Sequence, residues 1–167
     1  MKKLYFLRHG KSDWDASYGA DHERPLNSRG KQASKAVGNE LRSKIERPDA
    51  VFCSTAIRTR QTWQIVAESA QWSDSCTHEN ELYLIDDHSL VEKIRKLDDG
   101  IASALFIGHQ PTTASIASWI TGESWIDVPT GTFLAIDLPV QSWRNLEAQT
   151  GSIMFRLLPR ELAGGDQ

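Results

Sequence analysis

Strand-like and helix-like segments alternate through the first two-thirds of this chain, and that alternation limits the possible folds more than any other feature. Short apolar runs typical of buried strands recur between longer segments whose apolar residues repeat at helical spacing. We expect strands at residues 3–7, 50–53 and 102–107, and helices from 27 or 28 to about 45 and at 55–70, 87–97 and 112–121. This order favours parallel strands joined by right-handed crossovers, with helices on both faces of the sheet.

The last third of the chain follows a different pattern. Residues 132–138 and 153–158 are predicted to be strands separated only by a loop, so we expect them to add an antiparallel edge to the sheet. A further short extended segment is expected at residues 82–85. The predicted fold is a three-layer α/β/α sandwich formed by a single domain over residues 1–160, with a C-terminal tail at 161–167.

Charge and apolar content argue against several kinds of partner. The formal net charge is −3 and charged residues of both signs are interspersed, which argues against binding to nucleic acid. The apolar run at residues 4–7 is too short for a signal-peptide core or a membrane span, so we expect a cytoplasmic protein without membrane contact. Cys53 and Cys76 have no metal-ligand spacing. We expect reduced thiols, although a disulfide between them stays open, as does the oligomeric state.

Basic and imidazole side chains follow three of the predicted strands at the point where each strand ends. Arg8, His9 and Gly10 follow the first, Arg58 comes shortly after the second, and His109 follows the third. Ligands of open α/β sheets bind beyond the carboxyl ends of the strands. The sequence therefore predicts one pocket that contains two arginines and two histidines.

Such a set of side chains suits the transfer of a phosphoryl group. The planar guanidinium groups of Arg8 and Arg58 can each donate paired hydrogen bonds to phosphoryl oxygens. Positive charge nearby lowers the pKa of a histidine, and a neutral imidazole is a competent nucleophile. We assign His9 as the nucleophile, Gly10 as the residue that lets the backbone approach the phosphate, and His109 as a donor to an equatorial oxygen. The scheme requires no metal and no cofactor, because the arginines neutralise the charge.

Four segments of the chain resemble the motifs of the histidine phosphatase superfamily, which includes phosphoglycerate mutases and acid phosphatases. The Arg-His-Gly motif of the family lies in Leu-Arg-His-Gly at residues 7–10. The segment at 25–33 resembles its Leu-Thr-x-x-Gly-x-x-Gln-Ala helix start, and 107–111 resembles its late Gly/Ser-His motif. The segment at 54–62 resembles Ser-Pro-x-x-Arg-x-x-Gln-Thr, with Thr55 in place of proline. The resemblance covers nearly the whole chain.

This resemblance implies a phosphoglycerate mutase-like fold and, given the short chain, a place in the SixA-type branch. Founding members of that branch act on phosphohistidine in signalling proteins. The resemblance carries the roles of the catalytic core over to Arg8, His9, Arg58 and His109. It implies a metal-independent phosphatase that acts on a phosphohistidine protein or on a small phosphorylated molecule.

The general acid that many superfamily members use is the role that carries over least directly. Glu81 is the best candidate, and Asp13 and Asp15 are weaker ones. Short SixA-type members are thought to lack the usual acid, and a phosphohistidine leaving group needs less protonation than an alkoxide. The sequence leaves both possibilities open.

Two other functions remain as alternatives. A mutase or phosphotransferase would use the same intermediate, although the short chain leaves little room for a second phosphate site. A module that binds phosphorylated proteins without catalysis is the other alternative. The four intact core residues, Arg8, His9, Arg58 and His109, argue against it.

Overall fold

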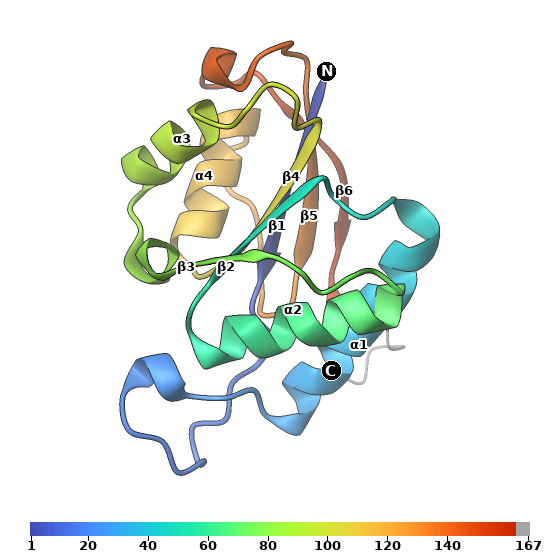
Figure 1. Ribbon diagram of the computed structural model, residues 1–167, viewed down its shortest axis with the longest axis vertical. Coiled ribbons are helices and arrows are strands. Elements are labelled where there is room, and N and C mark those ends of the chain that lie inside the picture. Colours follow the sequence, from blue (N-terminus) through green and yellow to red (C-terminus); the bar gives the residue numbers. More distant parts are fainter. Residues whose placement is uncertain (163–167) are drawn as a thin grey trace.

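A single mixed sheet of six strands forms the middle layer of the computed structural model, which describes residues 1–162 (Figure 1). In the order β3-β2-β4-β1-β5-β6, the first four strands are mutually parallel, β5 is antiparallel to β1, and β6 is antiparallel to β5. The predicted parallel sheet with an antiparallel edge is therefore confirmed. The strands are β1 (Lys2–Arg8), β2 (Ala50–Ser54), β3 (Thr77–Glu79), β4 (Ser103–Gly108), β5 (Phe133–Leu138) and β6 (Ser152–Leu157).

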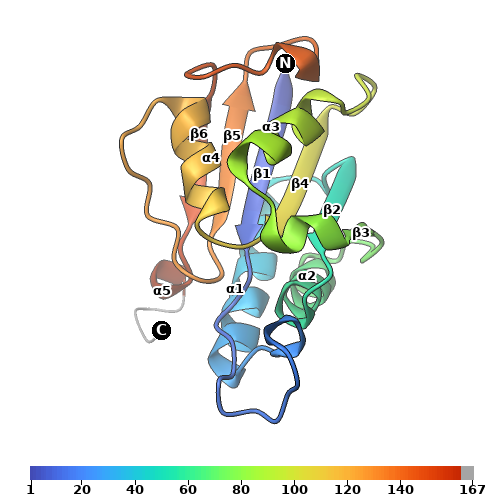
Figure 2. The same cartoon turned by 90° about the vertical axis from the view of Figure 1, so that its left-hand side faces the viewer.

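Helices cover both faces of the sheet, as the alternation of segments predicts (Figures 1 and 2). Alternate residues of β1 point to opposite layers: Leu4 and Phe6 pack in one core, and Tyr5 and Leu7 in the other. The first core lies under α3 (Asp87–Arg95) and α4 (Thr112–Thr121), and the second under α1 (Ser28–Lys44) and α2 (Ile57–Ala70). No helix within residues 1–162 combines the length and apolar character needed to cross a membrane.

The segment before α3 differs from the prediction. Residues 82–85, expected to be extended, lie mainly in a 3-10 helix, Asn80–Leu84, and the strand of this region is β3 at Thr77–Glu79. β3 is a mostly exposed edge strand of polar residues, so it lacks the apolar pattern by which strands are recognised. Leu82 is buried in the 3-10 turn whereas Leu84 is exposed, which explains why two nearby leucines do not make a strand.

The two ends of the predicted domain are described in part. The segment 10–26 between β1 and α1 contains a 3-10 helix, Asp21–Glu23, and a single bridge between Ser12 and Leu26. At the other end, α5 (Pro159–Leu162) extends two residues into the range expected to be a tail, and 163–167 lie outside the described residues.

Strand register brings the predicted site residues to one edge of the sheet. Arg8 at the end of β1 pairs with Gly108 at the end of β4, and the amide of His9 donates to the Gly108 carbonyl at 3.2 Å. Cys53 on β2 pairs with Ile107 on the other side of β4. The residues that follow β1, β2 and β4 are therefore neighbours, although they are about 50 positions apart in the sequence.

Candidate active site

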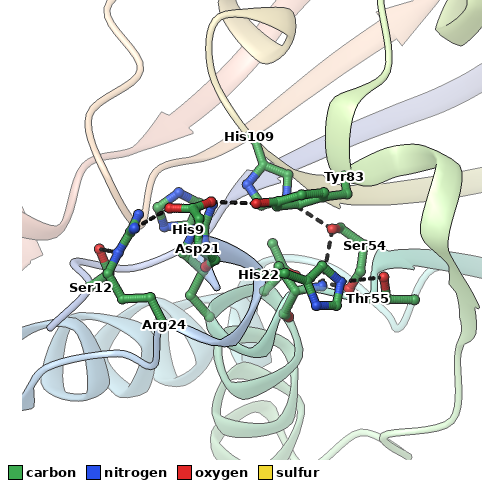
Figure 3. Close-up of polar contacts among 12 residues, drawn as sticks. His9, Ser12, Asp21, His22, Arg24, Ser54, Thr55, Tyr83 and His109 are labelled. Carbon is green, nitrogen blue, oxygen red and sulfur yellow. Dashed lines mark hydrogen bonds and ion pairs between the residues drawn. The ribbon is translucent and has the colours of Figure 1, made fainter. Parts of the chain in front are cut away.

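His9 and His109 face each other where β1 and β4 end, and Figure 3 shows both rings in one polar cluster. Their ring centroids are 5.3 Å apart. The backbone around His9 is held by Gly131, whose amide donates to the carbonyls of Arg8 and His9. The backbone of His9 is thus fixed by main-chain hydrogen bonds, and the structure places the two imidazoles side by side.

One ring nitrogen of His9 is engaged by the backbone and the other is free to react. The Nδ1 atom lies 2.7 Å from the carbonyl oxygen of Gly10, which is only an acceptor, so Nδ1 carries the hydrogen and Nε2 keeps its lone pair. Burial, with smaller contributions from the charges of Arg58 and Arg8, lowers the pKa of His9 to about 4. Nε2 is therefore an unprotonated nucleophile at neutral pH.

Gly10 has a packing role that follows from the same geometry. A Cβ atom at this position would lie 2.9 Å from the carbonyl oxygen of Gly30 in α1, so a larger residue would push the loop and the helix apart. The amide of Gly10 donates to Thr62 Oγ1 at 2.9 Å, which ties the loop to α2. The structure thus explains the glycine by close packing, and its proposed contact with phosphate stays a prediction.

His109 is oriented by Ser54, a residue whose role the sequence did not indicate. Ser54 Oγ accepts from the Ala56 amide and lies 2.8 Å from His109 Nε2, so its own hydrogen is available to that nitrogen. With Nε2 at Ser54, Nδ1 is the ring nitrogen of His109 that is left for a ligand. Burial lowers the pKa of His109 to about 3, with further contributions from His9 and Arg58.

The two arginines carry buried donors that lack an acceptor. Arg8 donates from Nη1 to the Val128 carbonyl at 2.9 Å, and Arg58 donates from Nη1 to the Asp21 carbonyl at 2.8 Å. Among the described residues, the buried Nε atoms of both side chains have no hydrogen-bond partner. A buried donor without a partner costs about 1–3 kcal/mol, so a bound oxyanion that accepts from these atoms would stabilise the site.

Asp21 is the acidic residue that the structure brings into the cluster, and nothing in the sequence singled it out. Its carboxylate accepts hydrogen bonds from Arg58 Nη2 at 3.0 Å, from Arg24 and from the hydroxyl of Tyr83. The Tyr83 hydrogen bond holds the pKa of Asp21 well below its usual range, and Arg24 and Arg58 lower it further. Arg24 in turn lies 3.6 Å from the ring centre of Trp14, whose side chain is exposed at the rim.

Glu81, the predicted general acid, is not brought into this cluster. Its exposed carboxylate pairs with Lys93 of α3 at 2.6 Å, and Lys93 also binds Glu79. The residue of the same 3-10 helix that reaches the site is Tyr83, two positions further on, whose ring lies edge-on to His109 with the centroids 5.4 Å apart. Asp13 accepts from the amide of Asp15 and shows no contact to the histidines. Within the described chain, no group of three or more His, Cys, Asp or Glu side chains is placed to hold a metal ion.

The lowered pKa values of the two histidines predict a specific titration behaviour. His9 and His109 should stay neutral as the pH falls from 7 to 5 and should gain protons near pH 4 and pH 3, instead of near the ordinary value of 6.5. Because the unfolded chain binds these protons near 6.5, acidification from there toward pH 4 should also lower the stability of the fold. Imidazole NMR signals, assigned with single-histidine variants, report the titration directly. A midpoint near 6.5 for either residue would contradict this environment.

Comparison with known proteins identifies relatives of this chain in sequence and in fold. A sequence model of the histidine phosphatase superfamily (branch 1) matches residues 4–84. The phosphohistidine phosphatase SixA of Escherichia coli is 29% identical over 111 residues, which cover 65% of this chain and 68% of that protein. An uncharacterized protein of Mycobacterium tuberculosis is 28% identical over 163 residues, covering 92% of this chain and all of its own length. The structure of the protein histidine phosphatase SixA complexed with tungstate matches with a TM-score of 0.81 and 23% identity, over 96% of this chain and 99% of that one.

Proposed function

We propose that this chain, which belongs to the histidine phosphatase superfamily and to its short SixA-type branch, hydrolyses phosphorylated substrates through a phosphohistidine formed on His9. One observation carries the proposal. Two neutral imidazoles lie beside the buried, unpartnered Nε donors of Arg8 and Arg58. An oxyanion would satisfy these donors, and the free nitrogen of His9 would then face its phosphorus atom.

The reaction proceeds in two displacements at phosphorus. His9 Nε2 attacks in line, so that a P–N bond to His9 forms while the bond from phosphorus to the leaving group breaks. Arg8, Arg58 and Nδ1 of His109 donate to the equatorial oxygens, where charge is spread in the transition state. A water molecule then attacks phospho-His9, the P–N bond breaks, and inorganic phosphate and neutral His9 are released. The hydrogen bond from His9 Nδ1 to Gly10 holds the ring in place throughout.

The surroundings of the leaving group favour phosphohistidine over an alkyl phosphate as the substrate. Asp21 is the carboxylate found in the cluster, and its strongly lowered pKa makes it a poor proton donor at neutral pH. A departing imidazole needs less protonation than a departing alkoxide. The related protein from Escherichia coli is named a phosphohistidine phosphatase, which supports the same assignment, and the tungstate complex of SixA supports binding of a tetrahedral oxyanion.

Hydrolysis assays separate this function from its alternatives. The wild-type protein should release inorganic phosphate from p-nitrophenyl phosphate and, more efficiently, from a phosphohistidine protein, with EDTA present throughout. Loss of turnover in EDTA that added metal restores would contradict the proposed mechanism. Transfer of the phosphoryl group to a second substrate without release of phosphate would favour a mutase. Tight binding of the phosphoprotein with no turnover would favour a non-catalytic module.

Replacing Asp21 by asparagine should tighten the binding of inorganic phosphate. The Asp21 carboxylate shares Arg58 with the proposed phosphate site and repels a second anion. Removing its charge should lower the inhibition constant of phosphate roughly fivefold, since one surface charge interaction is worth up to about 1 kcal/mol. Asp15→Asn, on the same loop, is the matched control and should leave the constant unchanged. Weaker phosphate binding in Asp21→Asn would mean that Asp21 positions Arg58 for the ligand instead of competing with it.

A further inference from the structure

The two cysteines of the chain lie on the same face of the sheet, the one that α1 and α2 cover. β2 pairs with β3 in parallel so that Cys53 is opposite His78, and side chains two residues apart on a strand share a face. Cys76, two positions before His78, therefore faces the same side as Cys53, and both pack in the core covered by α1 and α2. Both thiols are free, and the Cys53 thiol donates to the carbonyl of Ser54 at 3.3 Å.

We propose that Cys53 and Cys76 form a redox modification site, at which hydrogen peroxide produces a reversible disulfide that lowers the activity of the neighbouring site. The Cys76 thiolate attacks a peroxide oxygen, the O–O bond breaks, and a sulfenic acid and hydroxide result; the thiol proton converts the hydroxide to water. The sulfur of Cys53 then attacks the sulfenic sulfur. Its thiol proton leaves with the displaced hydroxide as a second water. Overall two thiols are oxidised by two electrons and one peroxide is reduced to two waters.

The surroundings of the two thiols indicate which one reacts with peroxide and which one forms the disulfide afterwards. Cys53 is fully buried whereas Cys76 is half-buried, so peroxide reaches Cys76 first. The Sγ atom of Cys76 lies 3.5 Å from His78 Nε2, a group that can take up the thiol proton. The neighbouring Cys53 thiol lowers the pKa of Cys76, and Arg47 and Arg60 lower it further, which favours the thiolate. Cys53 is then the resolving thiol.

Each cysteine is connected along the chain to residues of the proposed catalytic cluster. Cys53 is followed directly by Ser54, whose hydroxyl orients His109. On the other side, Cys76 is followed by β3 and then by the 3-10 helix that contains Tyr83, whose hydroxyl donates to Asp21. Thr55, which follows β2, donates to Asn80 at the start of that 3-10 helix. Because Cys53 and Cys76 are offset along the paired strands, closing the bond requires the short edge strand β3 to move. That movement displaces Tyr83 and strains Ser54.

Peroxide titration tests the site independently of any catalytic claim. Wild-type protein treated with hydrogen peroxide should lose two titratable thiols, and non-reducing peptide mapping should show Cys53 linked to Cys76. A dithiol reductant should restore both thiols. Two retained thiols, or separate over-oxidation of Cys76 without a crosslink, would overturn the proposal. Because this readout does not depend on turnover, it also stands if the proposed phosphatase function fails.

The expected loss of activity on oxidation rests on the proposed function, and steady-state kinetics measure it separately from the thiol titration. Oxidised wild type should show kcat/KM reduced by on the order of tenfold, a smaller loss than removal of a whole preorganised donor, and reductant should reverse it. Cys76→Ser, which should fold and keep the activity of the reduced enzyme, should be insensitive to the same treatment. A crosslinked wild type with unchanged kcat/KM would refute the coupling to the site, as would equal inactivation of Cys76→Ser.

Discussion

Replacing His9 by alanine should lower kcat by a factor on the order of 10⁴–10⁶, the loss expected when the nucleophile of a covalent mechanism is removed. No other described group is placed to substitute for it. The second imidazole, His109, is bound to Ser54 through Nε2 and is assigned as a donor to the phosphoryl group. Because the His9 ring hydrogen-bonds, in the part of the chain that the structure describes, only to the carbonyl of the adjacent Gly10, the variant should remain folded.

The measurement is the release of phosphate from p-nitrophenyl phosphate under saturating conditions, with circular dichroism to check the fold. His88→Ala is the matched control, since His88 is exposed on α3 and outside the cluster. It should keep full activity. A His9→Ala protein that is folded and retains more than about a tenth of the wild-type kcat would exclude His9 as the nucleophile.

Replacing Arg58 by alanine should lower kcat/KM by about 10²–10³ or more, since it removes a preorganised charged donor to the transferring phosphoryl group. The buried Nε of Arg58 has no partner among the described residues, and its Nη2 is held by Asp21. Arg58→Lys should recover only part of the loss, because a single ammonium group cannot reproduce the planar fork. The pKa of His9 should also rise toward its ordinary value in Arg58→Ala, because the Arg58 charge helps to lower it.

Arg60 provides the control for this prediction, because it lies two residues further along α2 and is exposed. Arg60→Ala should keep the wild-type kcat/KM and leave the titration of His9 unchanged. Steady-state kinetics of the three variants, together with NMR titration of His9, give the comparison. Equal losses in Arg58→Ala and Arg60→Ala would indicate a general effect of charge, and an unaltered Arg58→Ala would remove Arg58 from the site.

Much of the fold and of the cluster could be predicted because both depend on local patterns. Buried strands such as β1 and β4 are nearly continuous apolar runs, so their existence and order can be recognised without tertiary information. The rule that ligands bind at the carboxyl ends of parallel strands then brings His9 and His109 together. The structure places these two rings side by side as that rule requires.

The site residues that the sequence does not indicate lie where no local pattern exists. Asp21 belongs to a loop without periodicity, and its contacts with Arg58 and Tyr83 join three segments that are distant in the sequence. Ser54 has a role only because His109 lies across the sheet from it. Glu81 has a carboxyl group, but in the 3-10 helix this group pairs with Lys93, and it is Tyr83 that lies against His109. Side-chain direction in a short turn is set by tertiary packing rather than by composition.

Trapping of the covalent intermediate tests the central claim most directly. The enzyme is mixed with an excess of phosphorylated substrate, quenched in alkaline denaturant to preserve the P–N bond, and mapped by tandem mass spectrometry and ³¹P NMR. The mechanism predicts one phosphoryl group on His9, formed and lost at rates that account for kcat, and no such species in His9→Ala. A phosphoryl group on any other side chain, or rapid hydrolysis through a wild-type enzyme that never becomes phosphorylated, would contradict it.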